Sequence, residues 1–84
     1  MSIKYVRLNE LPPNVEAELC SIRAGRGLAS RLIAMGFRSG EKILRANGEF
    51  LRGPLRVKMG EMTMCMGYGM ANKIWVRYDE KKED

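Results

Sequence analysis

The sequence predicts a mostly β protein, a small barrel of five to six short strands with one short inserted α-helix. Short runs of alternating apolar and polar residues recur along the 84-residue chain, separated by Gly, Pro and Asn. One run shows helical spacing instead, and a glycine ends it after about two turns. Closely spaced short strands are typical of small barrels, which leave no sheet edge exposed.

The chain before the helix is expected to form two strands. Residues 3–8 alternate in character and make a short first strand. Residues 12–14, Pro-Pro-Asn, form a stiff turn, because proline fixes φ and lacks a backbone donor. Residues 15–22 alternate between apolar and acidic side chains, which predicts a half-buried strand, and residues 23–27 form a flexible loop.

The expected helix covers residues 28–35, where apolar side chains fall at helical spacing. Gly36 stands where a left-handed C′ residue belongs, because glycine adopts positive φ without a Cβ clash. Phe37 can then fold back onto Leu32, the apolar contact that accompanies such a cap. A second turn at Gly40 leads into the next strand.

The second half of the chain is expected to add further strands and one helical turn. In order, we expect a strand at 41–46, a turn at 47–49, a strand at 54–59, a tight connection at 60–61, a strand at 62–66, a break at 67–69, one helical turn at 70–73 and a last strand at 74–78. The strands on either side of Gly60 are expected to form a hairpin.

A chain of this length forms one domain, which we place at residues 1–78, with a flexible charged tail at residues 79–84. Its longest apolar run falls far short of the roughly 20 residues that a membrane span needs. The N-terminal segment lacks the apolar core of a signal peptide, so a cytoplasmic location is expected.

The charge of the chain favours an acidic partner. Residues 1–78 carry 13 basic and 6 acidic residues, a net charge of +7. Nucleic acid, an anionic membrane surface and an acidic protein face all fit this charge, which does not choose among them.

Arg23, Arg26, Arg31 and Arg38 cluster in or beside the expected loop and helix. They form either a solvated polar face or an electrostatic landing surface for a partner. The loop segment Gly-Arg-Gly at residues 25–27 lacks the remaining residues of a nucleotide-binding loop, so we interpret it as a connector.

No metal, cofactor or catalytic site is expected. Histidine is absent, so neither the usual zinc patterns nor a histidine base can be built. Cys20 and Cys65 lie on expected strands and are interpreted as buried free thiols. The methionines of residues 59–70 suggest a soft-metal site, but their strand spacing favours core packing or an apolar contact surface.

Four segments of the chain resemble the FeoA family, the small proteins of bacterial ferrous iron uptake, whose domain is also appended to some iron-dependent repressors. The segments are LNELPPNVEAEL, LASRLIAMGFRSGEKI, GPLRVKMG and ANKIWV, and they extend from about Leu8 to Val76. The most specific positions are Arg31, Leu32, Met35, Gly36, Phe37 and Gly40. The resemblance implies an SH3-like barrel with a small inserted helix and a non-enzymatic, regulatory role as partner of FeoB, the membrane ferrous iron transporter with a cytosolic GTP-binding domain.

The resemblance also implies a basic residue near Gly67 and an acidic residue near Met70. Here residues 66–70 are apolar and glycine-rich instead. This departure leaves open a different contact with the transporter or a different partner.

Two functions follow from these observations. The leading hypothesis is an interaction module that binds the cytosolic part of FeoB through Arg23, Arg26, Arg31 and Arg38, with self-association through the methionine-rich hairpin as an addition. The alternative is a nucleic-acid-binding small barrel that uses Arg56 and Lys58. Against the alternative, the aromatic residues are scattered, and no strand repeats the aromatic and basic pattern that stacks bases.

Overall fold

The computed structural model describes residues 2–46 and 54–82 of the chain. Within these ranges it contains, in order, β1 (Ile3–Arg7), the 3-10 turn η1 (Leu8–Glu10), β2 (Glu16–Ile22), α1 (Arg26–Ala34), β3 (Lys42–Arg45), β4 (Leu55–Met59), β5 (Met62–Met66), α2 (Tyr68–Ala71), β6 (Ile74–Asp79) and the 3-10 turn η2 (Glu80–Lys82). The short strands and the helix that follows β2 confirm the predicted mostly β class.

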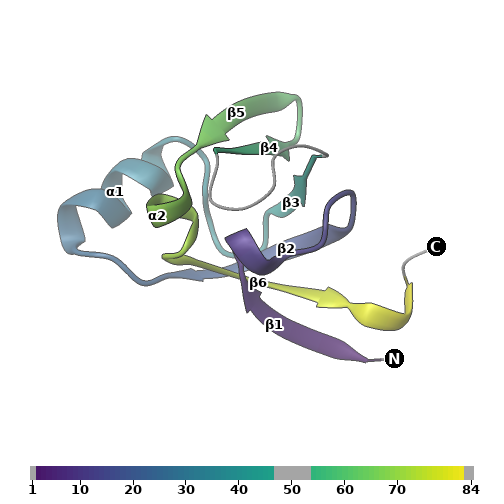
Figure 1. Ribbon diagram of the computed structural model, residues 1–84. Helices are drawn as coiled ribbons and strands as arrows, with labels where there is room; N and C mark the ends of the chain where they lie inside the picture. The colour runs from purple at the N-terminus through teal and green to yellow at the C-terminus, as the bar shows by residue number, and fades with distance from the viewer. Residues whose placement is uncertain (1, 47–53, 83–84) are drawn as a thin grey trace.

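The strands form one antiparallel sheet with the order β1-β6-β2-β3-β4-β5. The sheet curls, so that β1 and β5 lie at opposite sides of the molecule (Figure 1). Within the described residues, these two edge strands do not pair with each other, so the expectation that closure would remove the sheet edges is wrong. Leu32 of α1 and Ala71 of α2 are buried, and the two helices complete the core in place of that pairing.

One cluster of buried side chains forms the core. Its members are Leu8, Leu11, Ala17, Leu19, Leu32, Phe37, Ile43, Leu55, Val57, Met59, Met66, Ala71, Ile74 and Val76. In β4 buried and exposed residues alternate strictly, with Arg56 and Lys58 exposed, as the spacing predicts. Burying a side chain of the size of leucine contributes roughly 1.5–3 kcal/mol, so this cluster supplies most of the driving force for folding.

A Schellman cap ends α1. Gly36 has a φ of 108°, and its N–H donates to the Ile33 carbonyl at 3.0 Å, while the Phe37 N–H donates to the Leu32 carbonyl at 2.9 Å. The Phe37 side chain is completely buried in the same cluster as Leu32. Gly40 has a φ of 96° in the turn toward β3. The cap and the buried side chains hold a helix that is too short to persist alone.

Both helices begin two residues earlier than the sequence predicts. α1 starts at Arg26 rather than Leu28, because Gly25 takes the extended N-cap conformation with φ −61° and ψ 160°. α2 starts at Tyr68 for the same reason, since Gly67 has φ −69° and ψ 156°. Arg26 is therefore a helix residue rather than a loop residue.

Other differences concern the ends of elements. The first strand stops at Arg7, because residue 8 opens η1. The turn expected at residues 47–49 lies outside the described residues. In the segment expected as a charged tail, Asp79 is the last residue of β6 and residues 80–82 form η2, while residues 83–84 lie outside the described residues.

The two cysteines differ in their surroundings. Residues 19–21 of β2 contain a bulge that leaves Cys20 partly exposed. Burial raises the pKa of the Cys20 thiol, the charge of Arg77 opposes this rise, and the charge of Glu18 adds to it. Cys65 is exposed, so its expected burial is wrong: it occupies an outward position of β5.

Candidate partner-binding site

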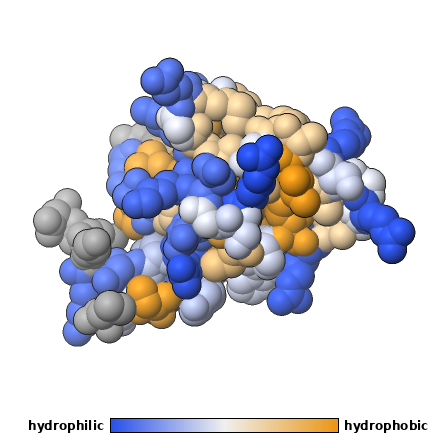
Figure 2. Space-filling model, turned by 180° about the vertical axis from the view of Figure 1, so that it is seen from behind, coloured by the Kyte–Doolittle hydropathy of each residue, from blue (hydrophilic) through white to orange (hydrophobic). Residues whose placement is uncertain are grey.

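A hollow of about 260 Å³ lies between α1, β5 and α2, and we call it the α1 groove. Its described lining consists of Leu28, Arg31, Leu32, Met35, Met64, Cys65, Met66, Gly67 and Met70. Figure 1 shows α1 beside α2 at one end of the molecule, with β5 above α2 and both chain termini at the opposite end. From behind, apolar surface extends along the upper edge, at the height of β5, next to hydrophilic side chains (Figure 2).

α1 contributes one stripe of side chains to this groove. Leu28, Arg31, Leu32 and Met35 stand at positions i, i+3, i+4 and i+7, which lie on one helix face. Leu32 is only 3% exposed, whereas Met35 at the end of the helix is 45% exposed. This wall therefore extends from the core to the open surface.

The opposite wall comes from the methionine-rich hairpin and α2. Met66 is a core residue at 5% exposure, while Met64 and Met70 are partly buried and pack against the core. The two expected roles of the methionines, core packing and apolar contact surface, are thus divided among them. Only the tertiary structure brings Met64 beside α1, because about 30 residues of chain separate them.

The four predicted arginines are all exposed, but they do not converge on one point. Arg31 lines the α1 groove, and the other three do not. Arg23 follows β2, Arg26 opens α1, and Arg38 follows the helix cap. Within the described part of the chain, none of the four side chains has a hydrogen bond or an ion pair.

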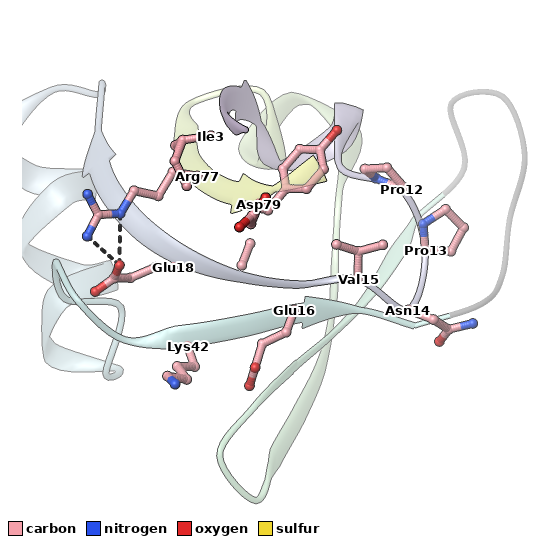
Figure 3. A pocket seen from close by; sticks show the side chains of 12 residues that line it. Ile3, Pro12, Pro13, Asn14, Val15, Glu16, Glu18, Lys42, Arg77 and Asp79 are labelled. Carbon is pink, nitrogen blue, oxygen red and sulfur yellow. Dashed lines mark hydrogen bonds and ion pairs between the residues drawn. The ribbon is translucent and has the colours of Figure 1, made fainter. Parts of the chain in front are cut away.

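A second, larger hollow of about 840 Å³ lies beside β2 and the end of β6. Its lining includes Pro12 and Pro13 near one end and the pair Glu18 and Arg77 at the other, with Lys42 on β3 (Figure 3). Acidic and basic residues are mixed here, in contrast to the α1 groove.

Three of the charged residues around this second hollow, Glu18, Arg77 and Asp79, have partners within the molecule. The Arg77 Nε and Nη2 atoms donate to Glu18 Oε1 at 2.8 and 2.6 Å, and this hydrogen bonding raises the pKa of Arg77. The Asp79 Oδ1 atom accepts the backbone N–H groups of Ser2 and Lys81, each at 3.1 Å. These contacts connect β6 to β2, to the residue before β1 and to η2, so they indicate a structural role.

Among the described residues, no group of three or more Cys, Asp or Glu side chains could hold a metal ion. The described part of the chain likewise contains no helix of the length and hydrophobicity required to cross a bilayer. The α1 groove combines an apolar lining with Arg31, whose side chain has no partner in the described structure, and such chemistry is suited to binding a protein surface.

The family model of the FeoA domain matches residues 6–78, which is most of the chain. The chain belongs to the FeoA family. A FeoA crystal structure described as an iron uptake regulatory protein is 26% identical with a TM-score of 0.78, covering 88% of this chain and 97% of that one. The FeoA of Chlorobium tepidum is 27% identical with a TM-score of 0.78, covering 93% of this chain and 74% of that one.

A third structure, the FeoA of Stenotrophomonas maltophilia complexed with zinc, is 26% identical with a TM-score of 0.73, covering 86% of this chain and 94% of that one. That protein is described as a procaryotic SH3 domain protein and as a candidate ferrous iron transport activating factor. No curated protein sequence matches this FeoA chain. Together the matches confirm the SH3-like fold and the association of the family with ferrous iron transport.

Proposed function

We propose that this FeoA is a cytoplasmic, non-enzymatic regulatory protein that binds the cytosolic part of a FeoB-type ferrous iron transporter. The observation that carries the proposal is the run from Arg23 to Arg38, which contains four arginines and no acidic residue. All four arginines are exposed, and in the described structure no side chain of the protein neutralises them. Such a surface attracts an acidic partner and accelerates the encounter with it.

The fold provides a rigid platform for this contact. The Schellman cap at Gly36 and the buried Phe37 fix the position of α1 on the core. A rigid helix loses little conformational entropy when it binds a partner. Regulation then requires that the protein bind one state of the transporter more tightly than another, since equal binding to both states shifts nothing.

The described structure favours a protein partner over nucleic acid. Arg56 and Lys58 of β4 are exposed, but their cross-strand neighbours in β5 are Cys65 and Thr63. Neither neighbour is aromatic, so this ladder lacks the stacking surface on which single-stranded nucleic acid binds. We therefore propose no specific nucleic-acid partner.

The test is a comparison of two variants with the same change in net charge. In the first variant, Arg23, Arg26, Arg31 and Arg38 are replaced by Gln. In the second, four exposed basic residues of other elements, Lys4, Lys42, Arg56 and Lys58, are replaced by Gln. Binding to the full-length transporter in lipid nanodiscs is measured against empty nanodiscs, with and without guanine nucleotide.

The first variant is expected to bind the transporter at least about tenfold more weakly than the wild type, and the second less than about threefold more weakly. Equal losses in both variants would show attraction by net charge alone and would contradict a specific arginine surface. Equal binding to empty and loaded nanodiscs, or no binding by the wild type, would contradict the transporter as partner.

A further inference from the structure

The α1 groove has a composition suited to one kind of ligand. Met35, Met64, Met66 and Met70 all line it, together with Leu28. Methionine side chains are unbranched and polarisable, so they adapt to apolar groups of different shape. At about 260 Å³, the groove is smaller than a typical cofactor pocket of about 300–1,000 Å³, and it suits inserted side chains better than a cofactor.

Arg31 is the one charged residue in the described lining of this groove. A guanidinium beside the sulfur atoms opposes binding of a soft metal cation, and it favours a carboxylate instead. Its own helix, α1, contains no acidic residue that could occupy it. The groove therefore pairs an apolar surface with a fixed positive charge that lacks a partner in the described structure.

We propose that the α1 groove receives an amphipathic segment of the transporter, which inserts an apolar side chain among the methionines and places a carboxylate on Arg31. The inference rests on the proposed function and adds to it the chemistry of the contacting segment. In this arrangement, Met35 and Met70 hold the inserted side chain, and the ion pair with Arg31 sets the orientation of the segment.

Charge argues for a partner segment over a second copy of this chain. A two-fold dimer places the same surface against itself, so the arginines of α1 would face the arginines of the other copy. Within the described residues, the C-terminal turn η2 is not a candidate occupant either, because it lies at the end of the molecule opposite α1 (Figure 1).

The chain offers matched controls on α1. Ile33 is 46% exposed and Met35 is 45% exposed, but only Met35 lines the groove. Likewise, Arg26 and Arg31 are both exposed residues of α1, but only Arg31 lines the groove. Comparing Met35→Gln with Ile33→Gln, and Arg31→Gln with Arg26→Gln, separates the groove from the rest of the helix surface.

In nanodisc binding, Met35→Gln and Arg31→Gln are expected to weaken the affinity at least about fivefold, whereas Ile33→Gln changes it less than about twofold. Arg26→Gln is expected to weaken the affinity less than Arg31→Gln does. Arg31→Lys keeps the charge but loses the planar guanidinium, so it is expected to bind more tightly than Arg31→Gln and more weakly than the wild type. Circular dichroism checks that each variant is folded.

A second readout uses protein labelled with ¹³C at the methionine methyl groups. Adding the transporter is expected to shift or broaden the signals of the four groove methionines, while the exposed Met62 outside the groove changes less. If the transporter binds but Met35→Gln and Ile33→Gln lose equal affinity, or if the Met62 signal changes most, the groove is not the binding site, while the proposed function stands. Groove signals that change with the concentration of the free protein would indicate a second copy and overturn the inference. Absence of transporter binding by the wild type would overturn both proposals.

Discussion

Two faces of this FeoA differ in whether their charged side chains have contacts within the described structure. Around β1, β2 and β6, several charged side chains contact other parts of the molecule: Arg77 pairs with Glu18, and the Arg7 guanidinium lies 5.1 Å from the ring centre of Trp75. On α1 and in the segments beside it, Arg23, Arg26, Arg31 and Arg38 lack such contacts in the described structure, and the helix is held from beneath by its cap and by Leu32.

This difference separates residues that hold the fold from residues that are available to a partner. An exposed ion pair contributes little to stability, because water screens it and ordering its side chains costs entropy. It also attracts a charged partner only weakly, because each of its charges is already compensated. The four arginines beside the α1 groove have no partner in the described structure, so neutral side chains in their place would support the fold equally well. Substitutions on the two faces should therefore have different consequences, which can be ranked by size.

The largest effect is expected beneath the α1 face. Phe37→Ala removes a completely buried aromatic side chain that packs below the helix. The free energy of unfolding, measured by urea denaturation, should fall by about 3–5 kcal/mol. Phe37→Leu is the control and should cost much less, since it keeps an apolar side chain in place. A loss below about 1 kcal/mol for the alanine variant would show that α1 is not anchored by this residue.

The next effect distinguishes the two ends of α1. Gly36→Ala forces a Cβ onto a residue with φ 108°, which should lower the free energy of unfolding by about 1–2 kcal/mol. Gly27→Ala, in the first turn, meets no atom within 4 Å and should raise it by about 0.5 kcal/mol. Urea denaturation of both variants checks the signs. Equal effects would contradict the role of Gly36 as the left-handed cap.

A smaller effect contrasts the charges of the two faces. Glu18→Gln removes a carboxylate that accepts two hydrogen bonds from Arg77, so the midpoint of urea unfolding should fall slightly, and less at high salt. Arg31→Gln should leave the midpoint unchanged while it weakens transporter binding. If Arg31→Gln destabilises the protein more than Glu18→Gln does, the division between the two faces is wrong.

The smallest effect concerns the two thiols. Because burial raises the pKa of Cys20, the protonated thiol is favoured in the folded protein, and this contribution to stability is lost as the pH rises through the raised pKa. Each thiol is measured alone: Cys20 in a Cys65→Ser variant and Cys65 in a Cys20→Ser variant. Cys20 should be alkylated more slowly than Cys65, and the pH dependence of its alkylation rate should have a midpoint above the ordinary thiol pKa. Faster alkylation of Cys20 would contradict its partial burial in β2.

Much of the fold follows from local sequence patterns, because alternation and capping depend on neighbouring residues. The alternation in β4 and the glycine cap of α1 are examples. The sequence pattern places the start of α1 too late, because glycine is a poor helix former and Gly27 therefore favours a loop. The bulge at Cys20 depends on pairing with β6, which no local pattern reports.

The candidate site could be predicted only in part. The arginines were visible in the sequence, and the spacing of Leu28, Leu32 and Met35 already marks one helix face. The groove itself depends on β5 and α2 reaching α1 through the tertiary fold, so Met64 and Met70 could not be assigned to it. For the same reason, sequence alone could not show that Arg31 differs from the other three arginines.

The central claim is that the face of α1, and not the face around β1, β2 and β6, binds the transporter. The most direct measurement is an amide chemical-shift titration of labelled protein with the cytosolic domain of FeoB, in a form shown to bind guanine nucleotide. Saturable shifts concentrated in residues 23–38 and 64–70 are the predicted result. Shifts concentrated in residues 3–7, 16–22 and 74–79, or no shifts at all, would contradict it.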